Sequence, residues 1–279
     1  MKDILVLTIK GFFLGIANII PGVSGGTLAI TMGIYEDLIG AISHFFKNIK
    51  KNIKFLIPLG VGILIAILLM SKIISYCLDK FPFPTTLFFI GLIVGGIPLI
   101  SRKVKGVKVK PTNVLLFLLT FGIIMVMTFL NEGTNIVSLA NISLTQMLLL
   151  FIVGMVAAAT MVIPGVSGSF VLMLLGYYKP IVSTISNLTN FNILGHNLLV
   201  LIPFGLGVLI GIILIAKLIE FLFNKYEIPT YYAILGFVIS SVVGLGVGLV
   251  GTSINAIQII IGVILFIIAS IIGYKLGDE

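Results

Sequence analysis

Long apolar runs separated by short polar stretches make up most of this chain. Several runs exceed the about 18 residues that indicate a membrane-spanning helix, and period-2 alternation, which would indicate a β-barrel, is absent. The pattern predicts six spanning helices, over residues 55–78, 85–101, 112–130, 198–222, 231–251 and 254–274. We therefore expect an all-α polytopic membrane protein.

Two more apolar regions, 11–45 and 147–178, are each broken by the same motif. Pro21-Gly22-Val23-Ser24-Gly25-Gly26-Thr27 breaks the first region, and Pro164-Gly165-Val166-Ser167-Gly168-Ser169 breaks the second. Each half of a broken region holds roughly a dozen residues, too few to cross about 30 Å of hydrocarbon at about 1.5 Å per residue. Each region is therefore either a re-entrant hairpin of two half-helices or one interrupted span. Hairpins place both termini in the cytoplasm, whereas interrupted spans add two crossings and an external N-terminus.

Positions outside the motif repeat as well, which indicates a duplication through the whole chain. Matched pairs are Gly11 and Gly154, Gly33 and Gly176, Tyr35 and Tyr178, Pro58 and Pro203, Lys72 and Lys217, and Gly91 and Gly236. We expect one integral membrane domain over residues 1–279, with repeat 1 at about 1–131 and repeat 2 at about 145–275. Each repeat is a broken helical hairpin followed by three transmembrane helices.

Loop charges predict that the two repeats are inverted in the membrane. The loop 47–54 carries four lysines, whereas its counterpart 179–197 carries only Lys179. The loop 102–110 carries five basic residues, and its counterpart near 247–254 carries none. Because basic loops stay in the cytoplasm, equivalent loops of the two repeats face opposite sides.

The composition excludes several other classes of protein. The chain is 59% hydrophobic and 9% charged, with a mean hydropathy of +1.29. Its net charge is +8, and the basic residues are concentrated in the two basic loops. This distribution is expected of loops beside an anionic leaflet and is not that of a nucleic-acid-binding surface. Cys77 is the single cysteine, and His44 and His196 are isolated, so we expect no disulfide, metal site or cofactor. Tyr177, Tyr178, Tyr231 and Tyr232 are typical of aromatic belts.

The motif has the chemistry of an anion site without a fixed charge. Its glycines let backbone N–H groups approach an anion, and the half-helix after the break begins with a partial positive charge. Ser24 and Thr27 add hydroxyl donors, and Asn18 adds an amide. By inverted symmetry, Ser167 and Ser169 would face them across the membrane midplane. The alternative is that Pro-Gly only kinks each helix or gives a small-residue packing contact.

Charged residues near the broken regions allow two interpretations each. Glu36 or Asp37 is a proton carrier for coupling or a solvated helix end. Lys72 and Lys217 attract a lipid phosphate or extend to the interface. Lys10 is a headgroup contact or a cytoplasmic anchor.

Catalysis is poorly supported by these residues. The chain shows no Ser/His/Asp set, its only arginine is Arg102, and no paired carboxylates accompany the second motif. A phosphatase acting on a lipid diphosphate needs a base and an arginine or a metal on the phosphates. We therefore expect a protein that is not an enzyme.

The duplicated motif and its Ile-Ala-Asn-Ile-Ile-Pro-Gly lead-in at residues 16–22 resemble the polyprenyl-phosphate transporter family over nearly the whole chain. The resemblance implies a multi-pass protein of the cytoplasmic membrane that returns undecaprenyl phosphate from the outer to the inner face. It also implies that the phosphate is cradled by Gly22, Ser24, Gly25, Gly26, Thr27, Gly165, Ser167, Gly168 and Ser169. The motif is similar to the Pro-Gly-x-Ser-Arg-Ser-Gly loop of undecaprenyl-diphosphate phosphatases, but Gly25 and Gly168 occupy the arginine position.

We therefore expect a flippase for polyprenyl phosphate, with the lipid and the bilayer as its partners. A secondary transporter of a small soluble anion and a membrane polyprenyl-diphosphate phosphatase are the alternatives.

The inverted topology is tested by a cysteine placed at position 190 in a chain whose Cys77 has been replaced. The cysteine should react with a membrane-impermeant reagent added outside the cell, because the loop 179–197 lies opposite the basic loop 47–54. A second cysteine at position 50 should react only from the cytoplasm. Labelling of position 190 from the cytoplasm would contradict the inversion.

Overall fold

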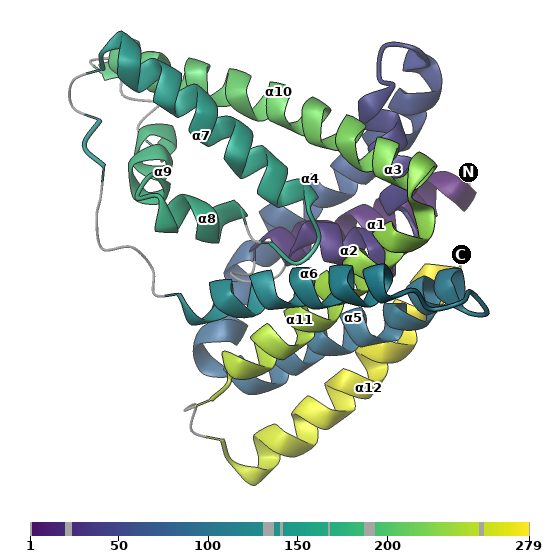
Figure 1. Cartoon of the computed structure of the whole chain (residues 1–279). Helices are drawn as coiled ribbons and strands as arrows, with labels where there is room; N and C mark the ends of the chain where they lie inside the picture. Colours follow the sequence, from purple (N-terminus) through teal and green to yellow (C-terminus); the bar gives the residue numbers. More distant parts are fainter. Residues whose placement is uncertain are drawn as a thin grey trace.

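The computed structural model describes residues 2–19, 24–130, 137–139, 142–166, 168–186, 193–250 and 254–278, and Figure 1 shows the whole chain. The described residues form α-helices joined by turns and short loops, with no strand among them. The first half contains α1 (Lys2–Ile19), α2 (Gly25–Thr31), α3 (Tyr35–Ser43), α4 (Ile49–Lys80), α5 (Pro82–Val104) and α6 (Pro111–Phe129). The second half contains α7 (Leu144–Val162), α8 (Gly168–Leu174), α9 (Tyr178–Ser186), α10 (Leu194–Lys225), α11 (Glu227–Val247) and α12 (Ala256–Asp278).

The helices confirm the all-α membrane fold and the six expected spans, which are α4 to α6 and α10 to α12. Several boundaries differ from expectation by a few residues. α4 and α10 begin earlier than expected, contain 32 residues each and enclose Pro58 and Pro203. Each proline was expected near the start of a span, yet it lies a few turns inside the helix. Seven described helices are long and apolar enough to cross a membrane, and the seventh is α7. Length and composition alone therefore do not decide between hairpins and interrupted spans.

Helices break at both motifs, as the sequence predicts. α1 ends at Ile19 and α2 begins at Gly25, while α7 ends at Val162 and α8 begins at Gly168. A second break follows one short helix later, at Gly33 and its matched Gly176, whose φ angles are +69° and +76°. This left-handed conformation ends a helix at low cost only with glycine. Each half therefore contains one long helix followed by two short ones.

The two broken segments enter the molecule from opposite ends. In Figure 1, α3 lies near the end that carries both chain termini, whereas α9 lies near the opposite end with the start of α7. The contacts agree, because Lys10 in α1 reaches the carbonyl oxygen of Met32 after α2, and Val137 donates its N–H to the carbonyl of Gly176 after α8. Each short-helix pair thus turns back toward the end at which its long helix started.

Helix pairs within and between the halves repeat the same packing. α1 packs on α4 and α7 packs on α10, while α5 packs on α12 and α6 packs on α11 across the halves. A β-carbon at Gly11 would overlap the carbonyl oxygen of Leu59, and one at the matched Gly154 would overlap that of Phe204. Glycine therefore lets these backbones touch, as is common between membrane helices.

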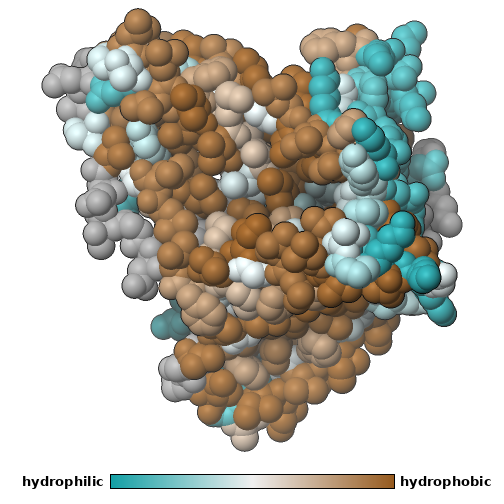
Figure 2. All heavy atoms as spheres, viewed as in Figure 1, coloured by the Kyte–Doolittle hydropathy of each residue, from teal (hydrophilic) through white to brown (hydrophobic). Residues whose placement is uncertain are grey.

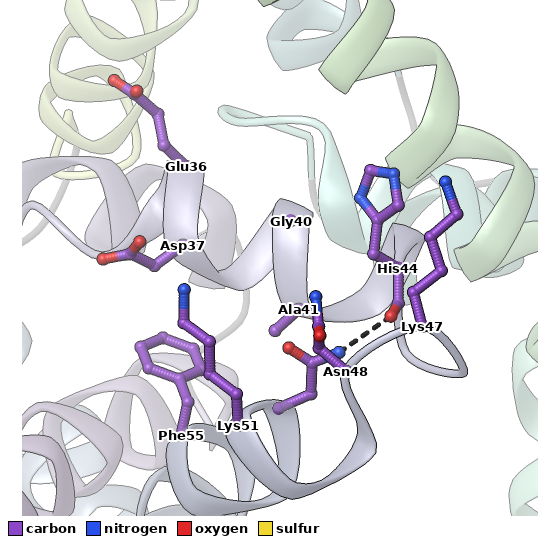
Figure 3. A pocket seen from close by; sticks show the side chains of 10 residues that line it. Glu36, Asp37, Gly40, Ala41, His44, Lys47, Asn48, Lys51 and Phe55 are labelled. Carbon is purple, nitrogen blue, oxygen red and sulfur yellow. Dashed lines mark hydrogen bonds between the residues drawn. The ribbon is translucent and has the colours of Figure 1, made fainter.

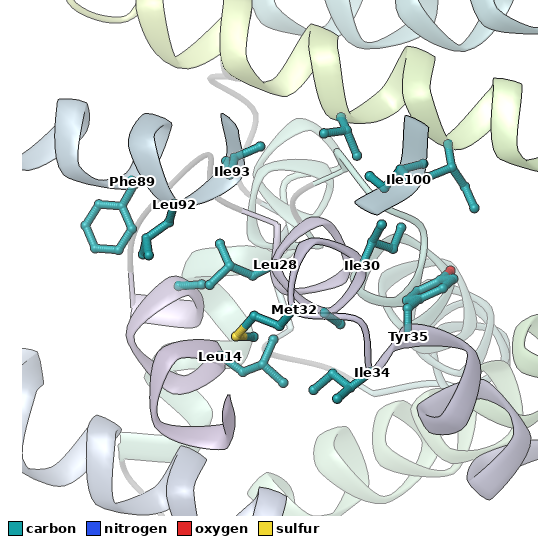
Figure 4. Packing of buried hydrophobic residues seen from close by; sticks show 14 of the residues in the cluster. Leu14, Leu28, Ile30, Met32, Ile34, Tyr35, Phe89, Leu92, Ile93 and Ile100 are labelled. Carbon is teal, nitrogen blue, oxygen red and sulfur yellow. The ribbon is translucent and has the colours of Figure 1, made fainter. Parts of the chain in front are cut away.

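α2 occupies the centre of the main hydrophobic core. Figure 4 shows side chains pointing outward from α2 and its C-terminal end in different directions, with Leu28 toward Leu92 of α5 and Met32 toward Leu14 of α1. α8 has no equivalent enclosure, since among the described residues it packs mainly on α7 and α9.

Most of the visible outer surface is apolar. Figure 2 shows hydrophobic side chains over most of this face, with most of the hydrophilic ones at the end with the termini and fewer at the opposite end. Exposed leucines and isoleucines such as Leu68, Leu209 and Ile260 suit contact with lipid chains rather than water. The hydrophilic end carries the basic segments 47–54 and 102–110 and is called the basic end below.

The close helix contact between α1 and α4 can be tested with two neighbouring glycines of α4. Gly62→Ala should destabilise the protein by about 1–3 kcal/mol, because its β-carbon would overlap the carbonyl oxygen of Thr8. Gly60→Ala should leave stability unchanged or slightly higher, since nothing lies within 4 Å of that β-carbon. Thermal unfolding in detergent, followed by size-exclusion chromatography, measures both variants. Equal midpoints would contradict the packing.

Candidate functional site

The two motifs meet in the interior of the molecule. The Gly165 N–H donates a hydrogen bond to Thr27 Oγ1 over 2.7 Å, and Ser24 Oγ lies 3.5 Å from the carbonyl oxygen of Ile163. A β-carbon at Gly26 would lie only 2.7 Å from the carbonyl oxygen of Val162. The start of α2 is therefore packed directly against the end of α7.

These contacts supply partners for the backbone at a broken helix end. The last carbonyl groups of a helix have no intrahelical donor, and in a lipid environment each unpaired group costs several kcal/mol. Tyr35 donates its hydroxyl to the carbonyl of Val162 over 3.1 Å, and Ser24 faces the next carbonyl. Residues of the first motif region thus stabilise the break in the second.

A cavity of about 330 Å³ lies beside this junction. One part is polar and is formed by Asn18, by Ser24 and by the motif glycines. The rest is apolar and is formed mainly by α3 and α4, with a contribution from the end of α7. The apolar lining side chains are Leu14, Leu38, Ile39, Ile42, Leu59, Ile63, Met161, Val162 and Val166. The cavity therefore combines a small hydrogen-bonding part with a larger hydrophobic part.

Five of the residues predicted to bind an anion line this cavity, and they come from both motifs. They are Asn18, Ser24, Gly25, Gly26 and Gly168. Gly25 allows a close approach, since a β-carbon there would lie 2.8 Å from Oδ1 of Asn18.

Two of the predicted residues have structural contacts instead of a place in the cavity lining. Thr27 is fully buried, and its hydroxyl oxygen accepts the N–H of Gly165. That N–H is consequently engaged within the protein. Gly22 and Ser167 lie outside the described residues, and the side chain of Ser169 also lies outside the description.

Glu36 takes part in a contact at the basic end. Its carboxylate accepts a short hydrogen bond from the hydroxyl of Tyr231, and Lys103 Nζ lies 3.6 Å from Oε1. Lys103 Nζ also lies 5.5 Å from the centre of the Tyr231 ring, a cation–π distance. Glu36 therefore joins α3 to α5 and α11. Asp37 lines the pockets on either side of this contact.

The predicted aromatic-belt role of Tyr231 is wrong. This residue is only 5% exposed and lies in the hydrophobic core. Its ring packs on that of Phe223 in α10, with Lys103 of α5 over its face, an arrangement that residue spacing along one helix does not reveal.

The three predicted lysines have different environments. Lys10 is 4% exposed, and its Nζ donates to the carbonyl of Met32 over 2.9 Å, so it stabilises the C-terminal end of α2 instead of acting as a surface anchor. Lys217 is exposed on α10. The side chain of Lys72 lies outside the description. Neither Lys10 nor Lys217 lines the central cavity.

Packing around the site is asymmetric. At the basic end, α3 of the first half packs extensively on α10 of the second half. The equivalent pairing of α9 with α4 is at most slight among the described residues. The sequence did not point to Tyr35, Lys103 or Tyr231 as contact residues, although the matched Tyr35 and Tyr178 marked a repeated position. The hydrogen-bond partners of Tyr35 and Tyr231 come from the other half of the chain, and Lys103 pairs with Glu36 of another helix.

The helices and their apolar surface define a multi-pass helical membrane protein. A family model described as undecaprenyl phosphate translocase-like matches residues 14–246. The chain belongs to this family, which confirms the resemblance in the motif.

Two curated relatives carry the same name. The polyprenyl-phosphate transporter of Staphylococcus aureus (strain NCTC 8325 / PS 47) is 33% identical over 273 residues, which cover 96% of this chain and 94% of that protein. The polyprenyl-phosphate transporter of Vibrio cholerae serotype O1 is 29% identical over 247 residues, which cover 84% of this chain and 74% of that protein. The family and both relatives are named for transport, which agrees with the expectation that the chain is not an enzyme. No solved structure matches the chain.

The junction between the motifs can be tested at two threonines of α2. Thr27→Val should destabilise the protein by about 1–3 kcal/mol, because the Gly165 N–H loses its acceptor in the interior. Thr31→Val is the matched control, since Thr31 is equally buried but its hydroxyl donates only within α2, to Leu28. Thermal unfolding in detergent should show a lower midpoint for Thr27→Val than for Thr31→Val. The reverse order would contradict the contact.

Proposed function

We propose that this protein transports polyprenyl phosphate across the cytoplasmic membrane and returns it from the outer to the inner face. The proposal rests on membership of the translocase-like family and on the names of the two curated relatives. The observation that carries it in this chain is the central cavity lined by residues of both motifs.

The chemistry of this cavity matches the two parts of a lipid phosphate. Phosphate oxygens accept hydrogen bonds, and the polar part offers the Ser24 hydroxyl, the Asn18 amide and the backbone at Gly25 and Gly26. The contact of Ser24 with Ile163 is long, so the hydroxyl can turn to a phosphate at little cost. The first isoprene units would lie along Leu38, Ile42 and Ile63, and the remaining chain would stay in lipid.

The described residues that line the cavity include no cationic side chain, which suits a carrier. A hydrogen bond from a neutral donor to the anionic phosphate contributes about 1.5–3 kcal/mol, and a lysine or arginine would add the attraction of a full opposite charge. An arginine or lysine in the cavity would hold the phosphate tightly and slow its release on the other side. Neutral donors allow binding from one leaflet and release to the other.

The proposed movement is a rocking of one inverted repeat against the other about the motif junction. In this scheme both termini and the basic loops lie in the cytoplasm, and the broken segments are re-entrant hairpins. Two observations support it: the broken segments turn back toward opposite ends, and α3 packs on α10 without an equal pairing of α9 with α4. Exchange of these two packings would open the cavity to alternate sides.

The apolar part of the cavity favours a lipid over a small soluble anion as the substrate. A soluble anion would leave nine apolar side chains without a ligand group to contact. A flipping assay with purified protein in liposomes separates these cases.

A fluorescent polyprenyl phosphate should move between leaflets when the wild-type protein is present. The Ser24→Ala/Ser167→Ala double variant should reduce the rate by about tenfold or more, because two hydroxyl donors to the phosphate are lost. Ser240→Ala/Ser270→Ala is the matched control, since each of these hydroxyls donates within its own helix.

The same liposomes test the alternatives. Uptake of inorganic phosphate without movement of lipid would replace the proposal with a soluble-anion transporter. Release of phosphate from polyprenyl diphosphate would indicate a phosphatase. Flipping that is unchanged in the Ser24→Ala/Ser167→Ala variant would contradict the assignment of the motifs.

A further inference from the structure

A second pocket lies at the basic end, between α3 and the start of α4. Its volume is about 410 Å³. Figure 3 shows its lining side chains, which come from α3 on one side and from the loop and first turns of α4 on the other. They are Glu36, Asp37, Gly40, Ala41, His44, Lys47, Asn48, Lys51, Asn52 and Phe55.

We infer that this pocket binds a phosphomonoester group, with Lys47 and Lys51 as its cationic ligands. The inference deepens the proposed function, because a lipid phosphate that leaves the central cavity toward the basic end would reach this pocket. The same chemistry would also admit free inorganic phosphate.

The two lysines line opposite ends of the pocket. Figure 3 shows Lys51 extending from α4 toward Asp37 of α3, and Lys47 lying beside His44 at the other end. Among the described residues, neither lysine has a carboxylate within 4 Å, because the only ion pairs found there join His44 to Glu220 and Lys103 to Glu36. Charge-assisted hydrogen bonds from lysine to a phosphate are the stronger kind, and lysine is a common phosphate ligand.

One of the two carboxylates that line the pocket already has a cationic partner. Glu36 is engaged with Lys103 and Tyr231 on its other side. Asp37 therefore remains as the lining carboxylate without a described partner, and Figure 3 shows it facing Lys51. His44 Nδ1 lies 3.0 Å from Glu220, so α10 holds the imidazole in place.

Backbone groups at the pocket also favour an anion. Asn52 is buried and donates its amide to the carbonyls of His44 and Phe45, which removes two acceptors that would repel a phosphate. The first turn of the 32-residue helix α4 contains no acidic residue. No carboxylate in that turn therefore neutralises the partial positive charge of the helix N-terminus.

α3 forms the wall between the two pockets. Its apolar face, with Leu38, Ile39 and Ile42, lines the central cavity, and its other face, with Asp37 and Gly40, lines the basic pocket. At about 100° per residue, these sets occupy opposite sides of one short helix. A displacement of α3 would join the two pockets, so a phosphate could pass from the neutral cradle to the lysines.

The chain has no tryptophan, so a single introduced tryptophan reports on this pocket. Phe55→Trp places the reporter in the lining, and Phe46→Trp places it on a side chain that is 79% exposed and outside the lining. Farnesyl phosphate added to the protein in phosphatidylcholine nanodiscs should change the emission of Phe55→Trp saturably and leave Phe46→Trp unchanged. No saturable change, together with no binding of radiolabelled farnesyl phosphate to the protein without a reporter, would overturn the inference.

Two matched double variants separate a site from general surface charge. Lys47→Gln/Lys51→Gln should weaken binding by about tenfold or more, because two charge-assisted contacts are lost. Lys50→Gln/Lys54→Gln removes the same charge from the same segment but from outside the lining, and should weaken binding less than about twofold. Equal weakening in both variants would overturn the inference.

Two further variants test whether the ligand is an anion or a cation and where it binds. Asp37→Asn should tighten binding of farnesyl phosphate, and weaker binding would indicate a cation site instead. Gly40→Leu should block binding without unfolding the protein, because nothing lies within 4 Å of its β-carbon. Full binding in Gly40→Leu would place the phosphate elsewhere and overturn the inference.

Competition identifies the source of the phosphate. Competition by inorganic phosphate would show that the pocket accepts the free anion, and competition by farnesyl phosphate alone would restrict it to lipid headgroups. Farnesol lacks the phosphate and should not compete, so equal competition by farnesol would overturn the inference.

The outcome is separable from that of the proposed function. Binding at the pocket should persist in Ser24→Ala/Ser167→Ala, in which flipping is expected to slow by about tenfold or more. Pocket binding without any flipping by the wild-type protein would reject the transport proposal alone. Flipping without pocket binding would reject the pocket alone.

Discussion

Broken helices inside a membrane protein need partners for the backbone groups that each break releases. In this chain the partners of one break come from the region of the other, since Thr27 accepts the N–H of Gly165 and Tyr35 donates to the carbonyl of Val162. Lipid cannot supply these hydrogen bonds, so the two motifs are held together by the cost of separating them. The central cavity exists because this junction leaves the polar side of α2 beside apolar side chains of α3 and α4.

The junction depends in turn on close helix packing outside it. α1 and α4 touch through Gly11 and Gly62, and α7 and α10 touch through the matched Gly154 and Gly207. Each long pair forms a rigid frame for one broken segment, while α5 with α12 and α6 with α11 connect the frames across the halves. A duplicated chain can therefore place two similar segments opposite each other, although α3 packs more extensively on α10 than α9 does on α4 among the described residues.

Neutral hydrogen-bond donors and cationic side chains line different pockets. The central cavity is lined by neutral donors and apolar side chains, whereas lysines gather in the pocket on the other face of α3. Neutral donors favour reversible binding, and lysines favour stronger retention of an anion. One short amphipathic helix thus separates two environments that suit successive positions of a phosphate group.

The sequence by itself determined the membrane class, the spanning helices, the two breaks and the duplication, because these depend on local apolar length and on residues repeated along one chain. It also indicated Ser24, Gly25, Gly26 and Gly168 as residues of one site, since the motif that contains them occurs twice. Only the tertiary structure decided that Thr27 joins the motifs, that Lys10 is buried against the end of α2, and that Tyr231 lies inside and contacts Glu36. One of these contacts joins α1 to a carbonyl beyond α2, and the others join helices of the two halves. The spacing of residues along one helix does not show which helix surfaces meet.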